Sequence, residues 1–131
     1  MYSNEHSPDY EFTLDVSLKS KARPRFSKGH AYLPKDYREW KKNCSECIKA
    51  HFSAHGWPQI SHARHLSLTF YGPARFDLDN LVGAVMDAGQ AGQKNSSWDG
   101  AWVDDRVSVF PSICANFVRD ATEQINVKVW L

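Results

Sequence analysis

The apolar residues of this chain repeat with two different periods, which limits the fold to a mixture of strands and helices. Residues 10–18 and 64–71 alternate between apolar and polar side chains, as half-buried strands do. Residues 36–54 instead place apolar side chains three and four positions apart, which predicts an amphipathic helix capped by Asp36. A chain of 131 residues can bury these faces in a single core, so we expect one domain.

The second half of the chain contains one shorter helix and two further strands. Asn80 is placed to cap a helix that ends near Gly89, and residues 88–100 lack any period. Residues 107–110 and 124–131 are apolar or alternating, which predicts two strands. The order β, α, β, α, β, β favours a compact α+β domain with a mixed sheet flanked by two helices.

Two segments are expected to be irregular. Residues 1–9 are polar and predict a flexible lead-in to a domain that spans residues 10–131. Residues 19–34 contain two prolines, one glycine and many cations without a period, which predicts a long loop with a short extended piece at 25–26. Long loops in compact domains are often functional, so this one is a candidate binding region.

The formal net charge of +1 conceals two regions of opposite sign. Residues 19–49 contain ten basic residues against three acidic ones, as expected of a surface that contacts phosphate groups. Residues 76–105 contain six acidic residues against a single lysine, as expected of a cation site. The absence of a long apolar run and the odd number of cysteines, three, favour a cytoplasmic protein with free thiols and no membrane partner.

Asp77 and Asp79 are the first candidates for a chemical role. In extended backbone, side chains at i and i+2 lie on the same face, so the two carboxylates would be close enough to share one cation. Mg²⁺ and Mn²⁺ prefer such oxygen ligands, and the water that they retain is a natural nucleophile for a phosphodiester. The alternative is structural, because Asp-x-Asp-Asn is also typical of a turn that caps a helix.

Asp105 is the third candidate. On a strand at 107–110, Asp105 would share a face with Val107 and Val109, and pairing beside residues 65–71 would let it reach the first two aspartates. Clustered carboxylates repel by about 4 kcal/mol per pair at ~4 Å and an effective dielectric of 20, a cost that a bound cation offsets. Adjacent aspartates before a strand are also common in turns, and this alternative stays open.

Four short motifs together resemble one known family. They are Arg-Pro-Arg-Phe at 23–26, Tyr-Leu-Pro at 32–34, Asp-Leu-Asp-Asn-Leu at 77–81 and Asp-Asp-Arg-Val at 104–107. In order and spacing they resemble the RusA-like Holliday junction resolvases of bacteria and their phages, over roughly residues 10–130. The two aspartate motifs are the specific part of this resemblance.

The resemblance implies a homodimeric endodeoxyribonuclease that binds four-way DNA junctions and cuts them with paired nicks in recombination and repair. It implies catalytic and metal-binding roles for Asp77, Asp79 and Asp105, with Mg²⁺ or Mn²⁺ as the cofactor.

This chain departs from the family pattern at Gly83, where members usually carry a lysine. A lysine at this helical position would point back toward the carboxylates and stabilise charge on the phosphate. The glycine therefore predicts slow or altered cleavage, with close packing of the helix or a substitute cation among Lys94, Arg75 and Arg106.

The cations of residues 19–34 are placed to follow a DNA backbone, although a solvated loop would have the same composition. The candidate nucleic-acid-binding residues are Lys19, Lys21, Arg23, Arg25, Lys28 and Arg75. Phe26, Tyr32 or Trp57 could insert into an opened junction, but packing in a core or lid is the favoured reading of all three.

Three other functions remain alternatives. One is a module that binds branched DNA without cutting it, which the glycine at position 83 would suit, and another is a metal-dependent hydrolase of some other phosphoester. The third is a zinc or thiol role for Cys44, Cys47, His51 and His55, which share one helix face. A structural role is favoured for these four, because side chains on one straight helix do not easily surround a tetrahedral ion.

Overall fold

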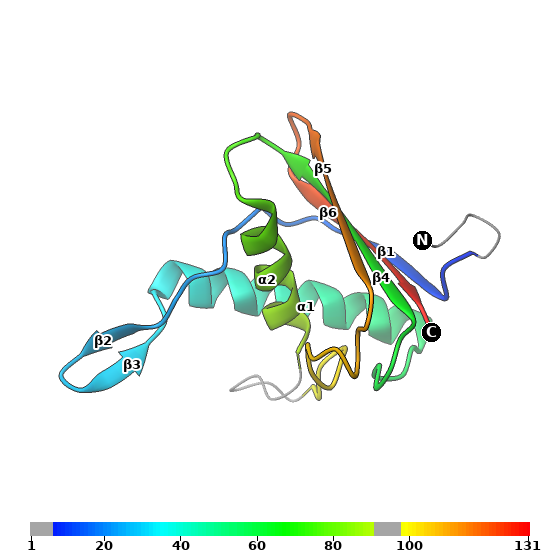
Figure 1. The fold of residues 1–131 in the computed structure, drawn as a ribbon, viewed down its shortest axis with the longest axis horizontal. Helices are drawn as coiled ribbons and strands as arrows, with labels where there is room; N and C mark the ends of the chain where they lie inside the picture. The colour runs from blue at the N-terminus through cyan, green and yellow to red at the C-terminus, as the bar shows by residue number, and fades with distance from the viewer. Residues whose placement is uncertain (1–6, 91–97) are drawn as a thin grey trace.

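The computed structural model describes residues 7–90 and 98–131 and has a four-stranded sheet with two helices on one face (Figure 1). The elements are β1 (Tyr10–Leu14), β2 (Arg25–Ser27), β3 (His30–Tyr32), α1 (Lys35–His55), β4 (His65–Gly72), α2 (Leu78–Gly89), β5 (Ile113–Arg119) and β6 (Gln124–Trp130). This arrangement confirms the predicted α+β class with a mixed sheet and two helices. Residues 1–6 of the expected lead-in lie outside the described residues.

The sheet has the strand order β1-β6-β4-β5. β6 is antiparallel to both of its neighbours, whereas β4 and β5 are parallel because α2 crosses between them. β1, β4 and β6 each alternate buried and more exposed residues, so their apolar side chains all face the helices. β5 is an edge strand with no fully buried residue.

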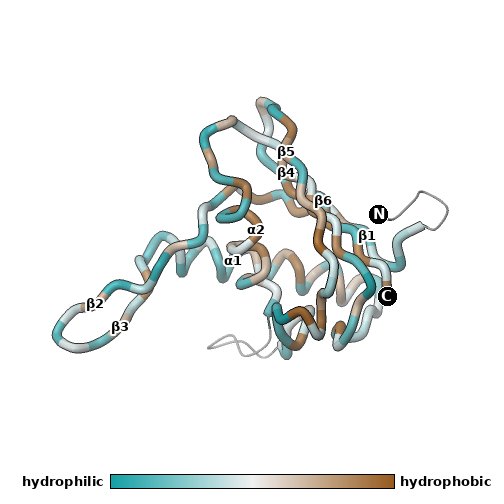
Figure 2. The backbone as a smooth tube through the Cα atoms, viewed as in Figure 1, coloured by the Kyte–Doolittle hydropathy of each residue, from teal (hydrophilic) through white to brown (hydrophobic). Residues whose placement is uncertain are grey.

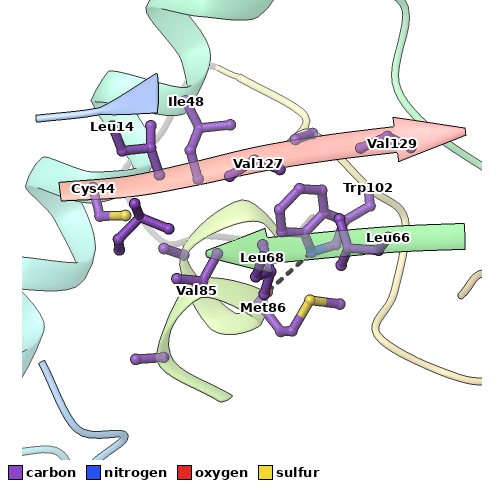
Figure 3. Close-up of a cluster of buried hydrophobic side chains, with 14 of the residues drawn as sticks. Leu14, Cys44, Ile48, Leu66, Leu68, Val85, Met86, Trp102, Val127 and Val129 are labelled. Carbon is purple, nitrogen blue, oxygen red and sulfur yellow. Dashed lines mark hydrogen bonds between the residues drawn. The ribbon is translucent and has the colours of Figure 1, made fainter. Parts of the chain in front are cut away.

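The core lies between the sheet and the helices. Figure 3 shows side chains of β1, β4 and β6 meeting Ile48 of α1 and Val85 of α2, with Trp102 closing one end. The Trp102 indole Nε1 donates to the backbone carbonyl of Met86 at 3.0 Å, and its ring contacts the edge of Phe110. Figure 2 shows apolar residues concentrated where the helices face the sheet.

The predicted strand at 107–110 is wrong. The backbone N–H groups of Val109 and Phe110 donate to the carbonyl of Arg106 at 2.9 and 3.0 Å, so the segment is a turn. Val109 and Phe110 are buried, which shows that their apolar character reflects core packing and not a strand. The strand that pairs with β4 begins later, at Ile113.

The expected caps are also wrong in position. α1 starts at Lys35 with Pro34 as its N-cap, so Asp36 is inside the helix and accepts a hydrogen bond from the backbone N–H of Tyr37 at 2.9 Å. α2 starts at Leu78, which places Asn80 in its first turn. The predicted helix spans hold to within a few residues, because they depend on apolar spacing and not on one capping side chain.

Two N-terminal segments are shorter or more regular than expected. The first strand ends at Leu14, and the chain then leaves the sheet, with the Leu18 N–H donating to the carboxylate of Glu123 at 2.9 Å. The long loop contains a β2–β3 hairpin, whose turn has positive φ at Lys28 and Gly29. No helix in the described part of the chain is long and apolar enough to span a bilayer.

Replacing Gly89 with alanine is expected to destabilise the protein. A Cβ at this position would lie 2.1 Å from the buried ring of Trp102, and overpacking of this kind costs about 1–3 kcal/mol. The free energy of unfolding in urea measures the effect. The control is Gly83→Ala, whose Cβ would meet only the flexible Lys21 side chain at 2.9 Å, and which should stay within about 1 kcal/mol of wild type. Equal stability of the two variants would contradict the packing role of Gly89.

Candidate active site

Asp77 and Asp79 lie at the start of α2, on the turn that follows β4. Asp77 is the N-cap residue with an extended backbone, and Asp79 is in the first helical turn. The expected strand geometry of the pair is wrong, because the helix begins between them at Leu78. Both residues are exposed, and the partial positive charge of the first helical N–H groups favours carboxylates at this position.

The Asp77 side chain does not act as a helix cap. An N-cap aspartate usually accepts a hydrogen bond from a first-turn N–H. Here the Asn80 and Leu81 N–H groups donate instead to the backbone carbonyl of Asp77, at 3.1 and 3.2 Å. Within residues 7–90 and 98–131, no hydrogen bond or ion pair engages the carboxylate of Asp77 or Asp79. Asp77 therefore occupies the N-cap position that the structural alternative predicts, but its carboxylate makes no capping hydrogen bond and is available to a ligand.

Asp105 lies near the opposite end of α2. Its neighbour Asp104 accepts hydrogen bonds from the Asp105 backbone N–H at 2.8 Å and from the side-chain amide of Gln90, the C-cap residue of α2, at 3.4 Å. Asp104 also pairs with the Arg106 guanidinium at 2.8 Å, whereas the Asp105 side chain is exposed. The segment before β5 is therefore attached to the end of α2 that is farther from Asp77.

The three predicted ligands do not meet within one chain. α2 (Figure 1) has 12 residues and spans about 18 Å at 1.5 Å per residue. Asp77 and Asp79 are at its start, and Asp105 follows Asp104, which contacts the C-cap residue Gln90 at the other end. Among the described residues, no group of three or more His, Cys, Asp or Glu side chains is placed to hold a metal ion. Asp105 was expected to reach Asp77 and Asp79 from a strand at residues 107–110, but these residues form a turn.

The comparison with known families decides the classification of the chain. The family described as Endodeoxyribonuclease RusA matches residues 15–130. The chain belongs to the RusA endodeoxyribonuclease family. The matched region contains every element from β2 to β6 and both aspartate motifs, and RusA membership implies a nuclease of branched DNA. No curated protein matches the sequence.

The position of the usual RusA-family lysine is covered by Lys21. The Lys21 backbone N–H donates to the carbonyl of Asn80 at 3.0 Å, and its side chain passes so close to Gly83 that a Cβ there would lie 2.9 Å from the Lys21 Cδ. The Lys21 ammonium ends 3.4 Å from the carboxylate of Asp87. A longer side chain at position 83 would therefore have to displace the flexible Lys21 side chain.

The structure places the Lys21 cation beside α2. The sequence had predicted Lys21 only as a DNA contact. No sequence signal could have located it, because residues 21 and 83 meet only through the fold. Arg75, Arg106 and Lys94 were the cations proposed to replace the family lysine. The Arg75 guanidinium carbon lies 5.1 Å from the centroid of the Phe76 ring, Arg106 pairs with Asp104, and Lys94 is outside the described residues.

Asp87 has a structural role in this region. The Tyr37 hydroxyl donates to its carboxylate at 2.8 Å, and Lys21 approaches the other carboxylate oxygen. Burial, followed by this hydrogen bond, raises the pKa of Tyr37 well above its ordinary value. These contacts link α1, α2 and the segment before the hairpin, so Asp87 is not free for metal binding.

The predicted DNA-contacting cations divide into two groups. Lys19 and Lys21 are engaged in ion pairs, Lys19 with Asp36 at 2.7 Å. Arg23, Arg25 and Lys28 are exposed and have no ion pair among the described residues. They lie on or beside the β2–β3 hairpin, which projects from the body of the molecule and is largely hydrophilic (Figures 1 and 2).

The aromatic residues of the hairpin do not pack in the core of this chain. Phe26 is 78% exposed and Tyr32 is 47% exposed, which contradicts the favoured packing role of both. Trp57 does pack as expected, because it stacks on Tyr10 at 4.5 Å between ring centroids. Phe26 faces the small residue Ala31 across the hairpin, so no cross-strand side chain covers its ring.

The cysteine and histidine face of α1 is structural. Cys44 is buried, the His51 ring is 2.9 Å from the carbonyl of Thr13, and the His55 ring stacks on Trp57. Burial raises the pKa of the Cys44 thiol to about 12. Each of these three side chains therefore has a partner within the fold, and the described residues contain no group of three or more His, Cys, Asp or Glu side chains placed to hold a metal ion.

The thiols should differ sharply in their reaction with a disulfide reagent at pH 8. Cys114 is exposed and should react within the mixing period, whereas Cys44 should react only after denaturant is added, because it is buried and protonated. Spectrophotometric thiol counting on wild type, Cys114→Ser and Cys44→Ala assigns each phase. Rapid native labelling of Cys44 would contradict the packing described above.

Proposed function

We propose that the protein is a divalent-metal-dependent endonuclease that resolves Holliday junctions by paired nicks as a homodimer. The observation that carries this proposal is a RusA-family chain in which Asp77 and Asp79 are both exposed at the N-terminus of α2. Their carboxylates have no hydrogen-bond or ion-pair partner within the described residues. Two exposed carboxylates without partners in the described structure are available to bind a cation on a rigid element.

The donor set fits a hard cation. Mg²⁺ and Mn²⁺ are bound in proteins by one or two carboxylates and retain several waters, so Asp77 and Asp79 are a sufficient anchor without Asp105, which lies beyond the other end of α2 in the same chain. Such an ion would supply an acidified water and charge stabilisation at a phosphodiester. The N-terminus of α2 adds a fixed positive potential at this end of the site.

The basic hairpin supports the choice of DNA as substrate. From Lys19 to Lys35 the chain has no acidic residue, so the projecting β2–β3 segment is a continuous positive arm. Arg23, Arg25 and Lys28 are not neutralised by partners in the described structure and can contact phosphate groups. A positive arm and an acidic site in one small domain form a charge pattern that suits a metal-dependent nuclease.

Cleavage of a labelled, mobile four-way junction tests the catalytic proposal. Wild type should produce paired nicks in Mg²⁺ or Mn²⁺, no nicks in chelator and far less cleavage of a linear duplex with the same sequence. Asp79→Asn should lower the single-turnover rate at least 100-fold, because it removes a metal ligand. The control Asp99→Asn changes an acidic residue near the buried Ala101 turn and should cleave normally.

Gly83 supports a second candidate, a module that binds branched DNA without cutting. Tight junction binding with no nicks in any metal would select this candidate and contradict the nuclease proposal. Gly83→Lys would then show whether the usual family lysine restores cleavage, although its side chain must displace Lys21.

The hairpin cations are expected to contribute mainly salt-dependent affinity. The double variant Arg25→Ala, Lys28→Ala should bind junctions more weakly, and its slope of log affinity against log salt should fall by about 2, or ~0.9 per lost phosphate contact. Fluorescence anisotropy between low and physiological salt measures this slope. Lys42→Ala, an exposed change on α1, is the matched control. An unchanged slope in the double variant would exclude the hairpin from the DNA interface.

A further inference from the structure

The β2–β3 hairpin has two chemically different faces. Successive side chains of a strand point to opposite faces, and directly opposed residues of an antiparallel pair share a face. One face carries four residues that can donate hydrogen bonds, which are Arg25, Ser27, His30 and Tyr32. The other face carries Phe26, opposite Ala31. The first face is suited to contact phosphate groups, whereas the second presents a single aromatic ring.

The Phe26 ring is not covered by any other part of the described chain. Phe26 is 78% exposed, and no ring contact within residues 7–90 and 98–131 involves it. Single exposed apolar residues are ordinary on protein surfaces and carry no information by themselves. Phe26 differs in its surroundings, because the chain from Lys19 to Lys35 has many cations and no acidic residue. An aromatic ring among positive charges matches a ligand that combines a flat apolar surface with a negatively charged backbone.

The turn of the hairpin holds this ring in a defined place. Lys28 and Gly29 have φ of 50° and 79°, and positive φ at both central residues is typical of a type I′ turn, whose twist matches that of the flanking strands. Asparagine, aspartate or glycine is usual at the first of these positions, and the lysine found here places a cation at the tip. Phe26 directly follows Arg25 and is two residues before Lys28. The ring is therefore carried by a short β-ribbon between two cations.

The base of the hairpin is attached to the helix that carries Asp77 and Asp79. The Lys21 N–H donates to the Asn80 carbonyl in the first turn of α2 at 3.0 Å, and on the other side of the hairpin Leu33 packs against the core. The five residues from Lys21 to Phe26 can span at most about 18 Å. Because a DNA strand advances about 3.4 Å per nucleotide, a base in contact with Phe26 would lie within about six nucleotides of this end of α2.

We propose that Phe26 stacks on an unpaired base at the branch point of the DNA, while Arg25 and Lys28 contact the phosphate groups beside that base. Proteins that bind single strands combine cations along the backbone with aromatic rings against the bases. The faces of a base inside a duplex are covered by its neighbours in the stack, so a free face is found at a branch, a gap or an opened base step. The hairpin thus recognises an unpaired base and not a sequence.

This contact gives the hairpin two separable contributions to binding. The cations attract any DNA, so their contribution depends on salt and not on the shape of the DNA. The ring contributes only where a base is unpaired, so its contribution depends on shape and hardly on salt. The inference rests on the proposed function for its substrate, branched DNA, but the stacking contact can be measured without any cleavage.

Binding of an immobile four-way junction and of a linear duplex, both in chelator, separates the two contributions. Phe26→Ala should bind the junction about 10- to 100-fold more weakly than wild type, as expected for the loss of one stacked base. It should bind the duplex like wild type and keep the wild-type salt slope. Phe26→Tyr retains an aromatic face and should bind the junction like wild type.

Leu131→Ala is the matched control. Leu131 is also an exposed apolar residue, at 43%, and it lies at the C-terminus on the side of the molecule away from the hairpin (Figure 1). Its replacement should change the affinity for neither DNA. If Phe26→Ala keeps full affinity for the junction, or loses affinity for the junction and the duplex equally, the stacking contact is wrong.

Photochemical cross-linking locates the stacked base directly. A junction with 5-iodouracil at a branch-point position, irradiated in complex with wild type, should form a covalent bond to the aromatic ring that lies against this base. Mass spectrometry of the digested complex should place the bond at Phe26. The same base moved one helical turn into an arm should not cross-link. A bond at Tyr32 in place of Phe26, or no cross-link from any branch-point position, would overturn the proposal.

Sedimentation and cleavage separate this inference from its alternatives. Phe26→Ala should sediment like wild type, and a changed oligomeric state would instead assign the ring to an interface between protein copies. If wild type cleaves junctions and Phe26→Ala binds and cleaves them equally well, the stacking contact is wrong while the nuclease function stands. If wild type binds junctions through Phe26 but cuts them in no metal, the nuclease function is wrong while the stacking contact stands. The absence of any DNA binding would overturn both.

Discussion

The packing of Trp102 against α2 is the contact on which the arrangement of the site depends. The indole is buried, donates to the Met86 carbonyl at 3.0 Å and occupies the space that a side chain at Gly89 would fill. The adjoining backbone also bonds to this helix end, with the Ala101 N–H donating to Gly89 at 2.8 Å. One aromatic residue thus fixes the end of α2 and the start of the segment that bears Asp105.

Because this contact is rigid, α2 acts as a spacer between carboxylates. Asp77 and Asp79 are held where the helix N-terminus favours negative charge, and Asp105 is held past the other end.

The positive surface is organised differently from the acidic one. Lys19 and Lys21 are used to attach the hairpin base to α1 and α2 through Asp36 and Asp87. This attachment leaves Arg23, Arg25 and Lys28 on the projecting arm. The Lys21 side chain also runs across α2 at Gly83, so a longer residue there would have to displace it.

The sequence alone determined the fold class, both helices and the strands at β1, β4 and β6, because these depend on local apolar spacing that any compact fold must bury. It also marked Asp77 and Asp79 as a pair, since they are two residues apart. The tertiary structure alone decided where Asp105 lies, that residues 107–110 turn into the core, and that Lys21 covers Gly83. Each of these depends on contacts between segments far apart in the chain, and apolar residues that fill a core turn have the same local pattern as those in a short strand.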